Sequence, residues 1–320
     1  MAQDRQQLVT STTTVAPLPT LPFDLLHEIL CRLPVRLLVQ LRCLCRSFNT
    51  LITDPKFAKK HLCLSTKQHR LVLSSREFLL YDSPIPSILS TSTITLTQLN
   101  YPVTREIYRD GKPFTLSTCD GILCFAIDHR SAILWNPSIR KFRLLPPLEN
   151  PHKRSYYPFS LYSFGHDPFI DNYKIIDISF CINRIEVRVN IMGTNYWRRI
   201  QDFPGPNSVW DLICEPGVFV GGTVNFLKYK DNIGTSRALV SLDLEKESYQ
   251  NLSQPELGTG KRTLQLGRVR DCLCIFVGSD ILKLVVRDSK NGSLNIPEIQ
   301  NTNLWMDPEV YIESLISPYS

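Results

Sequence analysis

The 320-residue chain lacks several features that would assign it to a common functional class. No apolar run approaches the roughly 18 residues that mark a membrane-spanning helix, so we expect no membrane partner. Despite a net charge of +6, no block of about five like charges suggests a nucleic-acid arm. Residues 1–19 lack the apolar segment of a secretory signal. We therefore expect a disordered tail there and residence in the cytoplasm, the nucleus or both.

Motifs of the common enzyme classes are also missing from this sequence. It contains no Gly-x-Ser-x-Gly elbow, phosphate-binding glycine loop or His-Glu-x-x-His helix, and its six histidines are scattered. The sequence therefore predicts a protein that is not an enzyme and that needs no cofactor. The basic stretch at Trp197, Arg198 and Arg199 has an aromatic neighbour, but no RNA-recognition or zinc-finger motif accompanies it. We expect a solvated surface there and no nucleic-acid partner.

Two cysteine pairs resemble half of a zinc site. Cys43 and Cys45 would diverge on a helix, whereas Cys272 and Cys274 would share one face of a strand. Structural zinc needs four ligands, and no second pair stands at a suitable spacing. The sequence favours buried, reduced thiols at both pairs and predicts neither a metal site nor disulfides.

Apolar periodicity predicts a small helical bundle over residues 20–64. One helix is expected from Pro22 to Leu33, a second from Pro34 through Phe48, and a third, shorter one after the break at Asp54. Three short helices in about 45 residues make a small core, so part of the apolar stripe requires further burial. Either the rest of this chain or another protein could supply that surface.

The remaining residues, 65–320, have the pattern of an all-β domain. Residues 186–191 and 240–245 alternate polar with apolar side chains and predict half-solvated strands, whereas residues 122–127 are continuously apolar and predict a strand covered on both faces. Closing prolines at 146, 204, 255 and 297 define a loose repeat. Its spacing is near the roughly 40 to 50 residues of a propeller blade.

Three segments give the helical region a family resemblance. Residues 21–36 (LPFDLLHEILCRLPVR), 42–48 (RCLCRSF) and 51–57 (LITDPKF) closely resemble an F-box. The resemblance implies a bundle that binds the Skp-family adaptor of a cullin-RING ubiquitin ligase. By this resemblance the adaptor-binding positions are Leu21, Pro22, Ile29, Leu30, Leu33, Pro34 and Leu38. Leu25, Leu41, Leu44 and Phe48 are assigned to the internal core.

The β region is similar to the second half of the same plant subfamily. Residues 119–124 (CDGILC), 134–141 (LWNPSIRK), 164–168 (FGHDP) and 196–198 (YWR) resemble the F-box-associated type 1, kelch-like domain. The resemblance implies a β-propeller that captures a protein substrate, whose identity the sequence does not give. It weakens past residue 280, so we expect an incomplete last blade.

The expected fold is thus an α+β multidomain protein, with a three-helix F-box bundle at 20–64 and a kelch-like β-propeller at 65–320. The expected function is substrate recognition in an SCF-type ubiquitin ligase. The alternative is a non-ligase interaction or scaffold protein. Its F-box would be structural, or would have lost adaptor affinity through Leu37, where the family has a small polar residue, and Gln40, where it often has Arg.

Overall fold

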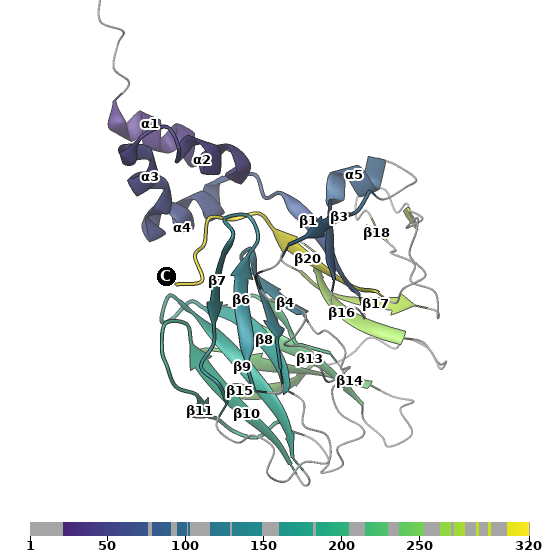
Figure 1. Cartoon of the computed structure of the whole chain (residues 1–320). Helices are drawn as coiled ribbons and strands as arrows, with labels where there is room; N and C mark the ends of the chain where they lie inside the picture. The colour runs from purple at the N-terminus through teal and green to yellow at the C-terminus, as the bar shows by residue number, and fades with distance from the viewer. Residues whose placement is uncertain are drawn as a thin grey trace, which may run out of the picture.

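The computed structural model of the chain describes most of both predicted regions. The described residues are 22–75, 79–90, 95–100, 102, 116–128, 130–148, 160–181, 184–204, 215–229, 237–252, 263–269, 272–278, 286–287, 294–295 and 306–319. The expected N-terminal tail, 1–19, lies outside them. Helices form the N-terminal part and antiparallel sheets form the rest, with the helices at one end of the β domain (Figure 1). This confirms the predicted fold class.

The bundle contains four helices where the sequence predicts three. They are α1 (Phe23–Leu30), α2 (Val35–Leu41), α3 (Arg46–Thr53) and α4 (Pro55–Leu64). The expected second helix is divided because Cys45 adopts an extended conformation, with φ −157° and ψ 164°. The break before α4 lies where it was expected: Asp54 accepts hydrogen bonds from the amides of Lys56 and Phe57, at 2.7 and 3.1 Å. This cap satisfies two amides that have no partner within the helix.

The interior of the bundle is a compact apolar cluster around one buried histidine. Its buried apolar residues are Leu30, Cys31, Val35, Leu38, Ile52, Phe57 and Ala58. His61 is only 1% exposed, and its Nε2 donates to the Leu33 carbonyl at 2.8 Å. Burial lowers the pKa of His61, although this hydrogen bond opposes the shift. The ring is therefore neutral at physiological pH and links α4 to the turn after α1.

Four four-stranded antiparallel sheets are arranged like propeller blades (Figure 1). The first contains β1 (His69–Ser75), β2 (Leu80–Pro84), β3 (Thr97–Leu99) and β20 (Met306–Ile312), with the short helix α5 (Ile85–Ser90) between β2 and β3. The second contains β4 (Leu116–Cys119), β5 (Ile122–Ala126), β6 (Ala132–Asn136) and β7 (Lys141–Leu144).

The third and fourth blades follow in chain order. The third contains β8 (Ser160–Asp167), β9 (Asn172–Cys181), β10 (Arg184–Ile191) and β11 (Arg198–Arg199), and the fourth β12 (Val218–Val220), β13 (Thr223–Tyr229), β14 (Arg237–Asp243) and β15 (Ser248–Leu252). Two further sheets have two strands each: β16 (Thr263–Val269) with β17 (Cys272–Gly278), and β18 (Val286–Arg287) with β19 (Leu294–Asn295).

The ring is closed by strands from opposite ends of the β domain. β20 pairs with β1 in an unbroken antiparallel register from His69↔Ile312 to Ser75↔Met306. β16 contacts both β12 and β20, so the β16–β17 sheet lies between the fourth blade and the first. The sequence predicts an incomplete last blade, and β16–β17 indeed has two strands among the described residues. Closure nevertheless occurs, because β20 completes the first blade from the C-terminal side.

The burial of the strands confirms the prediction of a fully covered strand and corrects the prediction of half-solvated strands. Ile122, Leu123, Cys124 and Phe125 are all fully buried, as their continuous apolar run predicts. The strands expected to be half-solvated, β10 and β14, are instead covered on both faces along most of their length. Their alternating polar residues are mostly buried and must be hydrogen-bonded, as Glu186 is to Arg184 and Arg188. Pro146 and Pro204 follow β7 and β11, whereas Pro255 and Pro297 lie outside the described residues.

The segment after β20 ties the helices to the propeller (Figure 1). Leu315 and Ile316 belong to the same apolar cluster as Leu30 and Phe57 of the bundle. The buried Asn136 amide donates to the carbonyls of Ser314 and Ile316, at 3.1 and 2.8 Å. We call residues 313–316 the C-terminal strap. It is packed between the two parts of the molecule.

Candidate functional site

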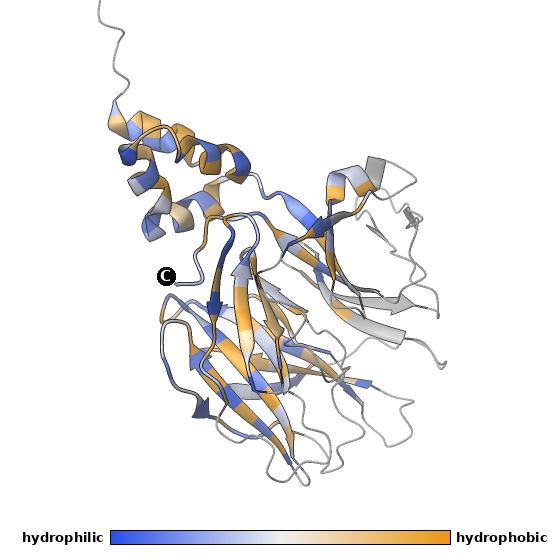
Figure 2. Cartoon of the chain, viewed as in Figure 1, coloured by the Kyte–Doolittle hydropathy of each residue, from blue (hydrophilic) through white to orange (hydrophobic). Residues whose placement is uncertain are grey.

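Several large apolar side chains of the helical bundle are exposed and do not take part in its core. Phe23, Leu25 and Ile29 of α1 are 64%, 53% and 50% exposed, Leu37 of α2 is 40% exposed, and Leu44 after α2 is 68% exposed. Leu25 and Ile29 are four residues apart, so they lie on the same face of α1. The propeller contacts the other side of the bundle, where Lys59 of α4 pairs with Asp171. Figure 2 shows apolar residues along the outer helices α1 and α2.

The seven predicted adaptor-binding residues divide into three groups in the structure. Pro22, Ile29 and Pro34 are exposed, and Leu33 is half-buried. Leu30 and Leu38 are 3% and 0% exposed. Both side chains form part of the bundle core, and adaptor binding by these two positions stays a prediction. Leu21 lies outside the described residues.

The structure also corrects the prediction of which residues form the internal core of the bundle. Leu25 and Leu44, expected inside, are among the most exposed apolar residues of the bundle, and Leu41 and Phe48 are half-buried. The buried face of α2 is formed by Val35 and Leu38, which turns Leu37 outward. Sequence reasoning did not select the exposed Phe23, Leu25, Leu37 and Leu44 as site residues. The one sequence feature that could have indicated them is an apolar stripe too broad to be buried within the small bundle core.

Charged side chains link α1 to α4. Glu28 accepts from Lys60 of α4 at 2.6 Å and from Arg32 at 2.9 Å. These hydrogen bonds, first that of Lys60 and then that of Arg32, lower the pKa of Glu28 to about 2. The carboxylate is therefore ionised at every physiological pH, and its ion pair with Lys60 links α1 to α4. The exposed apolar residues of α1 lie on this linked helix.

The basic stretch and the cysteine pairs considered in the sequence analysis can also be located in the structure. Arg198 forms a two-point ion pair with Glu247, at 2.6 and 2.7 Å, and Arg199 pairs with Asp202. Cys43 and Cys45, expected to be buried thiols, are exposed and free because they lie in and beside the turn that divides the second predicted helix. Side chains of Cys272 and Cys274 lie outside the described residues.

No group of three or more His, Cys, Asp or Glu side chains among the described residues is arranged to hold a metal ion. None of the helices in the described part combines the length and hydropathy of a membrane span.

A four-helix bundle that exposes apolar side chains, joined to a propeller, is the architecture of an F-box protein with a β-propeller. The model of the F-box domain matches residues 18–60, and that of the F-box associated beta propeller domain matches residues 64–285. The chain belongs to the F-box associated β-propeller family. This confirms the resemblance to plant F-box proteins.

Two similar proteins come from Arabidopsis thaliana. F-box/kelch-repeat protein At3g23880 is 29% identical over 79% of this chain and 71% of its own length. F-box protein CPR1 is 25% identical over 91% of this chain and 77% of its own length. Among solved structures, a chain in the crystal structure of a nidogen/laminin complex matches at 13% identity with a TM-score of 0.38, covering 60% of this chain and 64% of that chain. This last likeness is too weak to support an argument.

Proposed function

We propose that this protein is the non-catalytic substrate-recognition subunit of an SCF-type ubiquitin ligase. The bundle would bind a Skp-family adaptor, and through it the cullin and RING subunits, while the propeller would hold a protein substrate. One observation carries the proposal: Phe23, Leu25 and Ile29 are at least half exposed on α1, a helix whose one buried residue is Leu30. Covering such residues contributes roughly 25 cal/mol per Å² of apolar area, before the costs of association are subtracted.

The proposed mechanism is proximity. A receptor of this kind forms and breaks no bond, but raises the effective concentration of the substrate near the ubiquitin-charged enzyme. That role requires a rigid connection between the two binding surfaces. The C-terminal strap and the Lys59–Asp171 pair support such a connection, because both link the bundle to the propeller. The expected residence in the cytoplasm, the nucleus or both belongs to the same proposal, and imaging of the tagged full chain would test it.

Co-purification with a Skp-family adaptor tests the docking surface directly. The full chain should elute with the adaptor as a one-to-one complex in size-exclusion chromatography. Ile29→Asp should weaken the complex at least tenfold, or ~1.4 kcal/mol, because a charge would be buried without a partner. Because Ile29 is half exposed, this variant should fold normally, as circular dichroism would verify.

Phe169→Asp is the matched control for that variant. Phe169 is 75% exposed but lies in the propeller, in the turn between β8 and β9. It should leave adaptor binding unchanged. If the well-folded chain formed no complex, or if both variants bound the adaptor equally, the ligase proposal would fail. The scaffold alternative, with a structural F-box, would then lead.

A further inference from the structure

A cavity of about 270 Å³ lies beside the segment that links the helices to the propeller. Its walls come from elements far apart in the sequence: β4 and the turn that follows it, β20, β16, the start of β1 and the segment between α4 and β1. The residues that determine its chemistry are Lys67, His69, Thr118, Cys119, Asp120 and Arg268. Neither the family match nor the proposed adaptor surface accounts for this cavity.

The polar groups of the wall are held in fixed positions. Thr118 Oγ1 donates to the Val310 carbonyl at 2.9 Å, which joins β4 to β20. The Tyr173 hydroxyl donates to Asp120 Oδ2 at 3.0 Å, and Ser314 Oγ donates to the Asp120 carbonyl oxygen at 2.6 Å. A site whose polar groups are already oriented loses little freedom when it binds a ligand. The wall is therefore preorganised.

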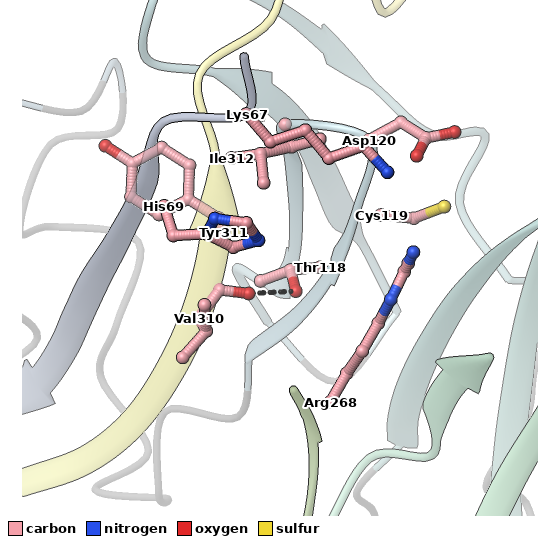
Figure 3. A pocket seen from close by; sticks show the side chains of 10 residues that line it. Lys67, His69, Thr118, Cys119, Asp120, Arg268, Val310, Tyr311 and Ile312 are labelled. Atoms are coloured by element: carbon pink, nitrogen blue, oxygen red, sulfur yellow. Dashed lines mark hydrogen bonds between the residues drawn. The ribbon is translucent and has the colours of Figure 1, made fainter. Parts of the chain in front are cut away.

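Lys67 and Arg268 are the lysine and arginine of the lining, and Asp120 is its carboxylate. In Figure 3, Lys67 and Arg268 extend from opposite walls toward the corner formed by Cys119 and Asp120. The Arg268 guanidinium lies 6.0 Å from the centre of the Phe219 ring, a contact that restricts its orientation. Arg268 is half-buried. An anion near it would therefore be screened less by solvent than at an open surface.

We propose that this cavity binds a small carboxylic acid, with its anionic group between Lys67 and Arg268. The oriented Asp120 carboxylate accepts a hydrogen bond from the ligand, so acids that also carry a hydroxyl or ammonium donor are preferred. The volume admits a compact acid and excludes a larger cofactor. Such an acid group could belong to a free metabolite or to the C-terminus of a protein.

Isothermal titration of the full chain with malate and succinate tests the proposal. The two acids differ by one hydroxyl, so malate should bind several times more tightly if Asp120 accepts from the ligand. Lys67→Met and Arg268→Met should each weaken malate binding at least tenfold. Lys246→Met, which removes an exposed cation outside the cavity, should have no effect. Inorganic phosphate is the probe for charge alone and should bind more weakly than malate.

Several outcomes would overturn the site. They are no malate binding to folded protein, binding that both cavity variants leave unchanged, or phosphate binding as tight as that of malate. A synthetic peptide ending in Asp distinguishes a free metabolite from a protein C-terminus as the source of the acid group. Competition with malate would show that a protein terminus also fits. No competition would restrict the site to free acids. Arg268→Met should still co-purify with the adaptor, so this result is independent of the ligase proposal.

Discussion

Arg188 lies directly opposite Asp177 in the β9–β10 ladder, with 3.4 Å between Nη1 and Oδ2. Asp177 is completely buried. Burial raises the pKa of Asp177 to about 6, although Ser179, Ser160 and Arg188 all favour the ionised form. The desolvation of the carboxylate therefore outweighs its partners at the centre of the third blade.

The Asp177 pKa predicts a specific pH dependence of stability. Because the folded pKa lies above the ordinary value of 3.8, the group favours the folded state at low pH. This contribution is lost as the pH rises from about 4 to about 6. Asp177→Asn removes the titration, so its free energy of unfolding relative to the parent protein should rise by on the order of 3 kcal/mol between pH 4 and pH 7. Urea unfolding at the two values measures this difference, and a pH-independent difference would contradict it.

Buried and exposed apolar residues of the bundle should respond differently to truncation. Leu38→Ala removes a fully buried side chain and should lower the free energy of unfolding by about 2–5 kcal/mol. Ile29→Ala, at a half-exposed position, should change stability by less than ~1 kcal/mol while weakening adaptor binding. Thermal unfolding and adaptor titration of both variants check the pair. Equal destabilisation would show that the inside and outside of α1 and α2 are wrongly assigned.

Two glycines with positive φ provide a matched test of packing beside the strap. A Cβ on Gly121, at φ +83°, would lie 2.4 Å from Ser314 Oγ and 2.6 Å from the Ile312 carbonyl oxygen. A Cβ on Gly221, at φ +57°, would meet nothing within 4 Å. Gly221→Ala should therefore cost only the backbone penalty of about 1–2 kcal/mol, and Gly121→Ala distinctly more. Chemical denaturation compares them. Similar losses would mean that the strap yields to a methyl group.

The two-part fold could be predicted from the sequence because helices, caps and strands are determined largely by residues close together in the chain. The apolar spacing in α1, the Asp54 cap and the continuous strand at Ile122 are all of this kind. Burial depends on partners that lie far away in the chain. Ile29 and Leu30 look equivalent in sequence, yet only Leu30 meets the bundle core. The break at Cys45, where an extended residue divides the predicted second helix, was likewise not marked by a proline or glycine.

The cavity and the ring closure were beyond local patterns for the same reason. Lys67, Asp120 and Arg268 come from three separate elements and line one space only after the blades are arranged. The pairing of His69 with Ile312 joins the two ends of the β domain. Nothing in the short strand at residues 306–312 distinguishes it from other strands until its partner is known.

The pairing of β20 with β1 also orders events during synthesis. The four helices are complete at Leu64, about 240 residues before β20 begins at Met306. The bundle can therefore fold on the ribosome while β1 still has an open edge, which is a template for pairing with other chains. A nascent chain cut short before residue 306 would display the outer helices beside that edge. Completion of translation through residue 312 is thus the step that covers the open edge of β1 and closes the propeller.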